Sequence, residues 1–186
     1  TGCTGTDEVT ITVLPPLNFE LFSDASSICP GDIVKLSVNM SGAPPYLVYT
    51  SDGTVVTPPI NISPTSSGFH YFYVQDGCGS IAHDSVYINV NTNPNPAFFS
   101  DKNDGCEPLT VSFNPASALP GQAYSWNFGD ISYNSISYMM NPVHEFTKDG
   151  IYNVSLTVTS SAGCDSAMVI NSMINVFQTP EARFIA

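Results

Sequence analysis

Gly150-Ile151-Tyr152-Asn153-Val154-Ser155-Leu156-Thr157-Val158-Thr159 is the stretch that decides the fold. From Tyr152 to Val158, apolar residues alternate with Asn, Ser and Thr, which is the pattern of a β-strand with one buried face. Gly150-Ile151-Tyr152 resembles the start of a tyrosine corner, where the ring packs and the hydroxyl caps a loop. Strand signals recur about every 8 to 12 residues along the chain, without helical periodicity, which favours an all-β sandwich.

Further strands are predicted on both sides of this stretch. Within Ile33–Asn39, the alternation places Val34, Leu36 and Val38 on one buried face. The other strands of the first half are predicted near Asn18–Phe22, Tyr46–Thr50, Ile60–Ser63, Phe69–Gln75 and Ser85–Val90, and those of the second half at Leu109–Phe113 and Tyr124–Phe128.

Three stretches of the chain echo each other, beginning at Gly2-Cys3, Gly77-Cys78 and Gly163-Cys164. Each continues into an alternating apolar strand and then a proline-bearing connector. The cysteines lie 75 (78 − 3) and 86 (164 − 78) residues apart, which is the length of one β-sandwich domain. We therefore expect the chain to be one part of a longer head-to-tail array of immunoglobulin-like sandwiches. Its parts are the last hairpin of a preceding repeat (1–14), two complete sandwiches (17–91 and 96–177) and the first strand of a following repeat (181–186).

The composition excludes several classes of partner. Sixteen acidic residues against four basic ones give a net charge of −12, whereas binding to nucleic acid or an anionic membrane requires clustered Lys and Arg. No apolar run approaches the roughly 18 residues needed to span a bilayer, so no membrane insertion is expected in this segment. Only 11% of the residues are charged, which is typical of secreted β-proteins with polar strand faces.

The five cysteines indicate an oxidising compartment. They recur near domain ends, four of them beside a glycine, which favours structural disulfides in an extracellular protein. Zinc is the alternative, but the chain has no CxxC pair and its three histidines are far apart in sequence.

The second half of the chain resembles the polycystic kidney disease (PKD) domain family over about residues 96–176. The resemblance rests on Trp126-Asn127-Phe128-Gly129-Asp130, then Asn141-Pro142-Val143-His144-Glu145-Phe146, then the stretch from Gly150. The family pattern is W-D-F-G-D-G, N-P-x-H-x-Y/F and G-x-Y-x-V-x-L-x-V. Asn127 and Ile131 depart from it, so the turn after Asp130 is expected to be distorted. The resemblance implies fold-signature roles for Trp126, Phe128, Asp130, His144 and Tyr152.

The first half, Leu17–Val90, resembles immunoglobulin-like or PKD-like repeats of Bacteroidota surface proteins, including gliding adhesins and type IX secretion cargo. The residues that carry this resemblance are Cys29-Pro30-Gly31-Asp32, Gly42-Ala43-Pro44-Pro45-Tyr46 and Asp76-Gly77-Cys78. It implies a secreted or cell-surface array. Asp84-Ser85-Val86 and Asp165-Ser166-Ala167 resemble the O-glycosylation sequon of the same bacteria, which makes Ser85 and Ser166 candidate modification sites at the start of the last strand of each domain.

Sandwich topology predicts an inter-domain disulfide between Cys29 and Cys164. Cys29 and Cys106 precede the second strand at one end of each domain, whereas Cys78 and Cys164 lie in the last hairpin at the other end. A strand of about seven residues at roughly 3.3 Å each separates these ends by more than about 20 Å, whereas the Cα atoms of a disulfide lie within about 7 Å. The alternative is pairing within domains, Cys29–Cys78 and Cys106–Cys164. Under the inter-domain scheme, Cys106 reaches forward to a further repeat, and Cys78 and Cys3 reach back.

Candidate chemistry in the chain is sparse. No serine or cysteine has a recognisable base, and the resemblance to the PKD family implies a packing and turn role for His144, so no enzyme activity is expected. No cofactor is expected either. Asp101, Asn103, Asp104 and Glu107 cluster in one loop and are weighed as a calcium site against a solvated turn, without the spacing of an EF-hand.

The favoured function is therefore a structural or adhesive segment that acts as a stiff stalk or filament. Its expected partners are neighbouring repeats, other surface proteins or polysaccharide. The alternative is a carbohydrate-binding accessory module of a secreted hydrolase, for which Tyr71, Tyr73, Tyr133 and Tyr138 are the candidate exposed aromatics against a packing role.

Overall fold

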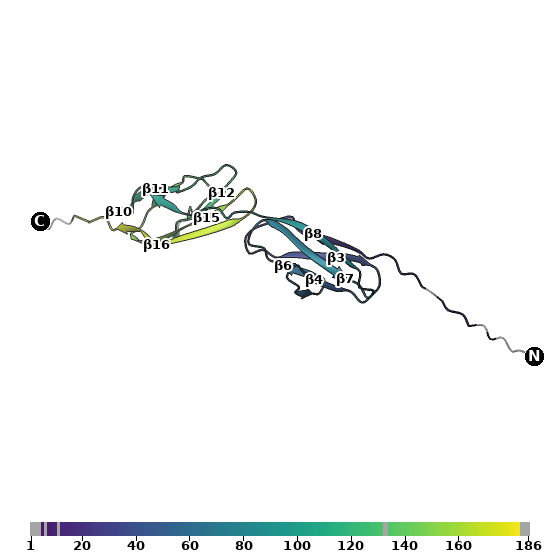
Figure 1. The fold of residues 1–186 in the computed structure, drawn as a ribbon. Coiled ribbons are helices and arrows are strands. Elements are labelled where there is room, and N and C mark those ends of the chain that lie inside the picture. The colour runs from purple at the N-terminus through teal and green to yellow at the C-terminus, as the bar shows by residue number, and fades with distance from the viewer. Residues whose placement is uncertain (1–4, 6, 11, 132–133, 183–186) are drawn as a thin grey trace, which may run out of the picture. The chain divides into compact units, whose positions relative to one another are not determined.

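The computed structural model describes residues 5, 7–10, 12–131 and 134–182. Across this part of the chain the only regular elements are β-strands (Figure 1), and no helix there is long and apolar enough to cross a membrane. The chain divides between Val90 and Asn91 into two compact units. The all-β prediction is confirmed.

The described residues of the first domain form eight strands in two sheets. A three-stranded sheet has the order β1-β3-β6, and a five-stranded sheet has the order β2-β8-β7-β4-β5. The strands are β1 (Asn18–Ser23), β2 (Ser27–Ile28), β3 (Val34–Ser41), β4 (Leu47–Thr50), β5 (Val55–Val56), β6 (Ile60–Ile62), β7 (Gly68–Gln75) and β8 (Ile81–Val90).

The core of the first domain lies between these two sheets, as expected for a sandwich. Val34 and Leu36 of β3 are fully buried, and Val74 of β7 and Ile88 of β8 are buried with them in one apolar cluster. The alternation predicted for Ile33–Asn39 is confirmed, because Ile33 on the other side is 68% exposed.

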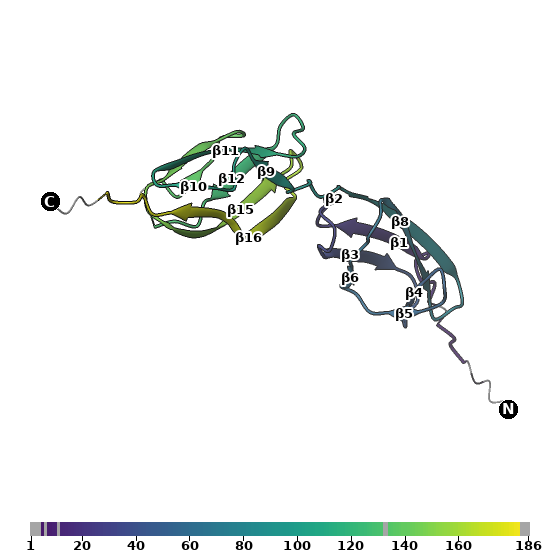
Figure 2. The same cartoon turned by 90° about the vertical axis from the view of Figure 1, so that its left-hand side faces the viewer.

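The second domain repeats this architecture (Figure 2). Its three-stranded sheet has the order β14-β11-β9 and its five-stranded sheet has the order β10-β16-β15-β12-β13. The strands are β9 (Phe98–Ser100), β10 (Asp104–Cys106), β11 (Leu109–Pro115), β12 (Ala123–Asn127), β13 (Ile136–Ser137), β14 (Val143–Phe146), β15 (Gly150–Thr159) and β16 (Asp165–Phe177).

The stretch from Gly150 forms β15, the centre of its sheet, and pairs with β12 on one side and β16 on the other. Val154, Leu156 and Val158 are fully buried against Trp126 and Phe113 in the second core cluster. A register shift between Tyr152 and Val154 marks a bulge near the start of the strand, which increases local twist and re-aims the neighbouring side chains.

The two domains share one topology, strand for strand. Their sheets correspond as β2-β8-β7-β4-β5 to β10-β16-β15-β12-β13. In both, the short first strand of this sheet pairs in parallel with the end of the last strand. Sequence reasoning did not find the short strands β2, β5, β9, β10 and β13, which have two or three residues each and are too short to show periodicity.

The strand predicted as Ser85–Val90 is longer than expected, because β8 begins at Ile81. The hairpin predicted for residues 1–14 falls partly outside the described residues, and residues 7–10 and 12–16 carry no strand. The strand predicted for 181–186 lies largely outside the described residues as well.

Candidate functional site

The predicted signature residues come together in the core of the second domain. Trp126 is fully buried in β12, and its Nε1–H donates to the carbonyl oxygen of Met139 at 2.9 Å. Phe98 contacts the indole edge-to-face, with ring centroids 5.2 Å apart. Phe128 packs on Phe113 at 5.1 Å. A buried indole with a satisfied donor and several ring partners anchors a core rather than a ligand.

His144 joins this cluster through both its ring face and its nitrogen. The imidazole stacks on Phe128 at 4.1 Å between ring centroids and meets Phe146 edge-on at 4.7 Å. Its Nε2 lies 2.9 Å from Oδ2 of Asp130, and both side chains are buried. The other carboxylate oxygen of Asp130, Oδ1, is buried without a hydrogen-bond partner. The packing role predicted for His144 agrees with these contacts.

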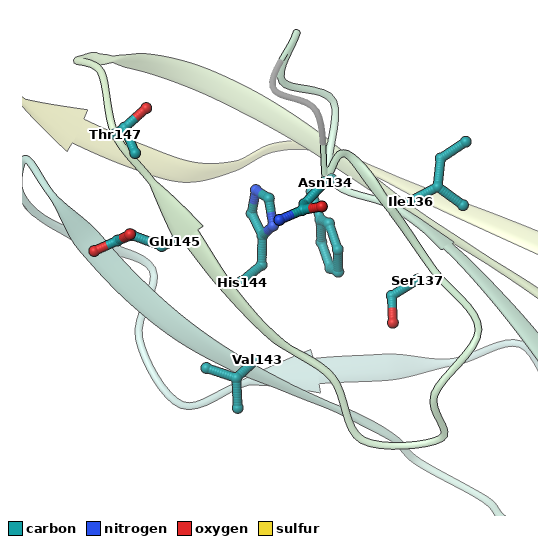
Figure 3. Close-up of a pocket in the computed structure, with 8 residues that line it drawn as sticks. Asn134, Ile136, Ser137, Val143, His144, Glu145 and Thr147 are labelled. Carbon is teal, nitrogen blue, oxygen red and sulfur yellow. The ribbon is translucent and has the colours of Figure 1, made fainter.

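A pocket of about 430 Å³ lies beside this histidine. Figure 3 shows the His144 side chain directed into it, whereas the neighbouring Val143 and Glu145 point away from the imidazole. Ser137 also lines the pocket, but its Oγ accepts from the backbone N–H of Met139 at 3.3 Å. Within the described residues no hydrogen bond joins His144 to a serine or cysteine, so these side chains do not form a nucleophile–base pair.

The turn after β12 is formed by Asn127, which departs from the family pattern, and by Gly129, which follows it. Asn127 takes the family's Asp position, and its Oδ1 accepts from the N–H of Gly129 at 2.9 Å. Gly129 has a positive φ of 75°. The turn after Asp130, which is predicted to be distorted, includes residues 132–133, and these lie outside the described residues.

Tyr152 forms the predicted tyrosine corner. Its hydroxyl donates to the carbonyl oxygen of Lys148 at 2.8 Å, and its ring packs on Phe146 with centroids 4.6 Å apart. Burial raises the pKa of the Tyr152 hydroxyl above its ordinary value, and the carboxylates of Asp130, Asp149 and Glu107 raise it further. The neutral hydroxyl is therefore held in place as a donor to the loop before β15.

The cysteines fall into two classes. Cys29 and Cys164 are disulfide-bonded, whereas Cys78 and Cys106 are exposed free thiols. The within-domain bonds Cys29–Cys78 and Cys106–Cys164 are therefore not formed. Cys3 lies outside the described residues.

Strand register explains why the within-domain bonds do not form. Cys29 directly follows β2, which pairs with the last two residues of β8, Asn89 and Val90. Cys78 lies in the turn before β8 begins. The 10 residues of β8 span about 30 Å at about 3.3 Å each, far beyond the reach of a disulfide. In the second domain, Cys106 pairs with Phe177 at the end of β16, while Cys164 directly precedes the first residue of that strand.

The Gly-Cys echo noted in the sequence is shifted by two residues in the structure. Both hairpin turns are closed by the same backbone bonds, Gly79 N–H to Asp76 O in the first domain and Gly163 N–H to Ser160 O in the second. Gly79 therefore corresponds to Gly163, and Ser80 to Cys164. Cys78 occupies the position of Ala162, at the tip of its turn. The Gly-Cys pairs therefore do not mark equivalent positions.

The hairpin that carries Cys78 is organised by a carboxylate that sequence reasoning missed. Asp76 is 8% exposed, and it accepts hydrogen bonds from the backbone N–H groups of Ser80 (2.8 Å), Cys78 (3.0 Å) and Ala43 (3.4 Å). Burial acts to raise the pKa of Asp76, but these three N–H donors outweigh it and hold the pKa below its ordinary value. An aspartate before a Gly-x-Gly turn is the only signal that the sequence offers for this network.

The loop weighed as a calcium site uses its oxygen atoms within the fold. Asp101 accepts from the N–H of Ser112, Asn103 from the hydroxyl of Ser100, and Glu107 from the N–H of Asp149. Asp104 lies in β10, paired with β16. Among the described residues, no group of three or more His, Cys, Asp or Glu side chains could hold a metal ion. The choice between a calcium site and a solvated turn stays a prediction.

The two candidate O-glycosylation serines occupy different positions. Ser166 is the second residue of β16, as predicted, whereas Ser85 lies in the middle of β8, opposite Tyr71. The expectation that both motifs begin the last strand is therefore wrong for Ser85. The cause is the longer β8, because apolar alternation was followed back only to Ser85, whereas pairing with β7 extends to Ile81.

The candidate aromatics are separated by the fold. Tyr71 and Tyr73 lie on one face of β7. Tyr138 is 76% exposed in the second domain, and Tyr133 lies outside the described residues. Sequence reasoning missed the other aromatic residues on the face of Tyr71 and Tyr73. The alternating pattern Phe69-x-Tyr71-x-Tyr73 could have identified Phe69 among them.

A match to a known protein family covers the domain that contains the signature residues. Residues 91–176 match the family described as the PKD domain. The second sandwich, here called the PKD segment, thus carries the family match that its motifs predicted. PKD and immunoglobulin-like domains are generally non-catalytic structural or adhesive modules of larger proteins, and together with a disulfide they fit an extracellular location.

Comparison with solved structures adds distant similarities. Murine CEACAM1b is 12% identical, with a TM-score of 0.39, and the match covers 86% of this chain and 100% of that one. The fibronectin(III)-like modules of Clostridium thermocellum CbhA are 12% identical, with a TM-score of 0.38 and coverage of 90% and 100%. The ectodomain of mouse nectin-like molecule 4 is 12% identical, with a TM-score of 0.38 and coverage of 91% and 67%. No curated protein sequence matches the chain.

Proposed function

We propose that this chain is a segment of a larger secreted or cell-surface repeat protein, where it acts as a stiff stalk or filament. The protein it belongs to is an adhesin-like surface protein of the Bacteroidota type that the first domain resembles. Its partners are the neighbouring repeats of the same chain and other molecules at the cell surface. The matching topology of the two sandwiches and the match of residues 91–176 to the PKD domain support this proposal.

The observation that carries the proposal is the state of the cysteines. Cys29 and Cys164 are disulfide-bonded, one in each domain, while the other two described cysteines are free. In this proposal the two bonded cysteines form a single bond with each other and join the first domain to the PKD segment. A covalent bond between domains is what a load-bearing stalk requires, because the proline-containing connector of residues 91–97 is a single chain.

Such a bond changes the path of a pulling force. It closes a loop of 135 residues (164 − 29) that contains most of both domains. Tension applied at the two ends of the chain then passes through the disulfide and leaves the enclosed strands unloaded. Between the two cysteines the load is carried by a covalent bond rather than by the hydrogen bonds of the sheets, whose net contributions are only about 0.5–1.5 kcal/mol each. Strands β1, β2 and β16 lie outside the loop and remain under load.

Strand register in the PKD segment predicts an equivalent disulfide to a following repeat. Asn175 and Val176 in β16 pair with Asp104 and Gly105, just as Asn89 and Val90 in β8 pair with Ser27 and Ile28. Cys106 therefore corresponds to Cys29. In the proposed array, Cys106 bonds to the last hairpin of a following repeat.

Cleavage of the connector tests the inter-domain bond directly. A specific protease site is inserted between Asn93 and Pro94, and the cleaved chain is run on denaturing gels with and without reductant. The two halves are expected to stay together without reductant and to separate with it. Cys29→Ser is expected to release the halves even without reductant, whereas the matched variant Cys78→Ser is expected to leave them joined. Separation of the unreduced wild-type halves would contradict the proposal.

A further inference from the structure

One face of the first domain carries six exposed or half-exposed aromatic rings. They lie on the outer side of the five-stranded sheet, away from the core, and are here called the aromatic face: Tyr49, Phe69, Tyr71, Tyr73, His83 and Tyr87. Phe69 is 59% exposed, Tyr87 48% and Tyr71 47%. Exposed aromatic patches of this kind on a soluble protein mark interaction sites.

Strand pairing arranges these rings in rows across the sheet. Tyr73 pairs with Tyr49 of β4 on one side and with His83 of β8 on the other. The Tyr49 and Tyr73 rings are stacked, 5.6 Å apart and inclined by 14°, and the Tyr73 and His83 rings are also 5.6 Å apart. A second row places Phe69 against Tyr87 at 5.1 Å. Tyr71 joins the second row, with its ring 6.1 Å from that of Phe69. The rings therefore form a platform of two contacting groups on neighbouring strands rather than isolated side chains.

The fold itself does not require this platform, as the PKD segment shows. Counted from Gly68 and Gly150, which begin the matching strands, Tyr71 corresponds to Asn153 and Tyr73 to Ser155. Pairing then places Asn127 and Val169 where the first domain has Tyr49 and His83. Because β15 is two residues longer than β7, counting back from the matching turns at Gly79 and Gly163 gives Ser155 and Thr157 instead, which are polar as well. The same surface of the same topology is thus mainly polar in one domain and aromatic in the other. The aromatic residues call for an explanation other than packing.

The charge of the aromatic face limits the partner. None of the outward residues of β4, β5, β7 and β8 is Lys, Arg, Asp or Glu, although the chain carries a net charge of −12. The nearest acidic residue of the β4–β5 turn, Asp52, accepts hydrogen bonds from Thr50 and Thr54 within its own turn. Stacking platforms for nucleic acids need a basic groove, which this face lacks. A second copy of the chain would bring its own negative charge and be repelled.

We propose that the aromatic face binds a neutral polysaccharide. The C–H faces of sugar rings pack on aromatic rings, while sugar hydroxyls need neutral donors and acceptors beside them. Tyrosine hydroxyls, Ser85 and Gln75 supply these on the face itself. An open depression of about 350 Å³ beside Tyr49 and Tyr73 is lined by Thr50 and Ser51. The face is extended and uncharged, which suits a polymer better than a small charged ligand. This inference is independent of the proposed stalk function.

Affinity electrophoresis of the full chain tests the inference. Native gels contain hydroxyethyl cellulose, xyloglucan, soluble starch or the anionic polymer alginate. The wild type is expected to be retarded by at least one of the three neutral polymers and not by alginate. The double variant Tyr71→Asn/Tyr73→Ser introduces the residues of the PKD segment at matching positions. It is expected to raise the dissociation constant for that polymer, obtained from the retardation, at least about tenfold, which corresponds to about 1.4 kcal/mol of binding free energy.

Controls distinguish loss of the site from loss of the fold. Tyr138→Asn removes an exposed tyrosine outside the aromatic face and is expected to leave the retardation unchanged. Tyr71→Asn alone, at a half-exposed position, is expected to keep the melting temperature of the wild type and to weaken binding. Absence of retardation by every neutral polymer would overturn the inference, as would retardation by alginate alone or equal loss in Tyr138→Asn. Concentration-dependent dimerisation of the wild type that Tyr71→Asn abolishes would also overturn it, in favour of self-association.

Discussion

Gly129 lies in the turn after β12 with a φ of 75°, and a Cβ built there would lie 2.2 Å from the carbonyl oxygen of Asn153. The neighbouring strand therefore passes directly over the glycine. Two constraints act on one residue, the left-handed backbone and the lack of space. The glycine of the W-x-F-G-D motif is explained by both, whereas the sequence alone indicates only that a turn follows Phe128.

Substitution of this residue tests the close approach. Gly129→Ala is expected to lower the free energy of unfolding of the PKD segment by more than about 2 kcal/mol, because the strain of a left-handed non-glycine residue adds to the clash. The matched control is Gly163→Ala, in the same domain, with a φ of 84° but no atom near the added Cβ. It is expected to cost only about 1 kcal/mol. Chemical denaturation measures both, and equal losses would contradict the close contact.

At the scale of elements, two loops are held by one side chain each. The loop before β15 depends on the Tyr152 hydroxyl, and the β7–β8 hairpin depends on the Asp76 carboxylate. The tyrosine corner was predicted because Gly-x-Tyr before an alternating strand is a recognisable pattern. The Asp76 network was not, because its partner Ala43 is far away in sequence and only the folded chain brings the two together.

Removal of the tyrosine hydroxyl tests the corner. Tyr152→Phe is expected to cost about 1 kcal/mol of unfolding free energy at pH 7, the usual value of one hydrogen bond. Because the folded state raises the pKa of Tyr152, its contribution is complete below the ordinary value of 10.0 and is lost as the pH rises through the folded-state pKa. The difference in unfolding free energy between the wild type and Tyr152→Phe should therefore become smaller above pH 10. Tyr138→Phe, at an exposed tyrosine, is expected to change neither the unfolding free energy at pH 7 nor its dependence on pH above 10.

Acid titration tests the hairpin. Because the pKa of Asp76 is lowered in the folded state, its carboxylate stabilises the first domain above the ordinary value of 3.8. This stabilisation is lost as the pH falls through the folded-state pKa. Asp76→Asn should make the domain less stable at pH 7 and flatten the fall in its denaturation midpoint below pH 3.8. Asp7→Asn, in the exposed segment before β1, should behave like the wild type, and an unchanged acid profile in Asp76→Asn would count against the network.

At the scale of the whole molecule, the sequence predicted the all-β fold class better than the details of strand pairing. Alternation and the Gly-Cys spacing indicated two sandwiches, because both depend on patterns that persist over many residues. The start of β8 and the shift between Cys78 and Cys164 were missed, since they depend on strand pairing. The aromatic face was only partly anticipated through Tyr71 and Tyr73, because its other rings lie on different strands and only the register aligns them.

The proposed Cys29–Cys164 bond makes a mechanical prediction that belongs to the molecule as a whole. With the bond intact, residues between the two cysteines cannot be stretched by a force applied at the chain ends. Once reduced, the 135-residue loop (164 − 29) becomes available to the force. At about 3.3–3.6 Å per extended residue, it adds up to about 450–490 Å of contour length, less the initial separation of its ends.

Single-molecule pulling from the two termini, first without and then with reductant, measures this difference directly. The predicted result is that the unreduced chain extends by little beyond its terminal segments, and that reductant releases a further extension of several hundred ångströms. Cys29→Ser should show the long extension from the start, whereas Cys78→Ser should behave like the wild type. Equal extension of the wild type in both conditions would contradict a disulfide that joins the two domains.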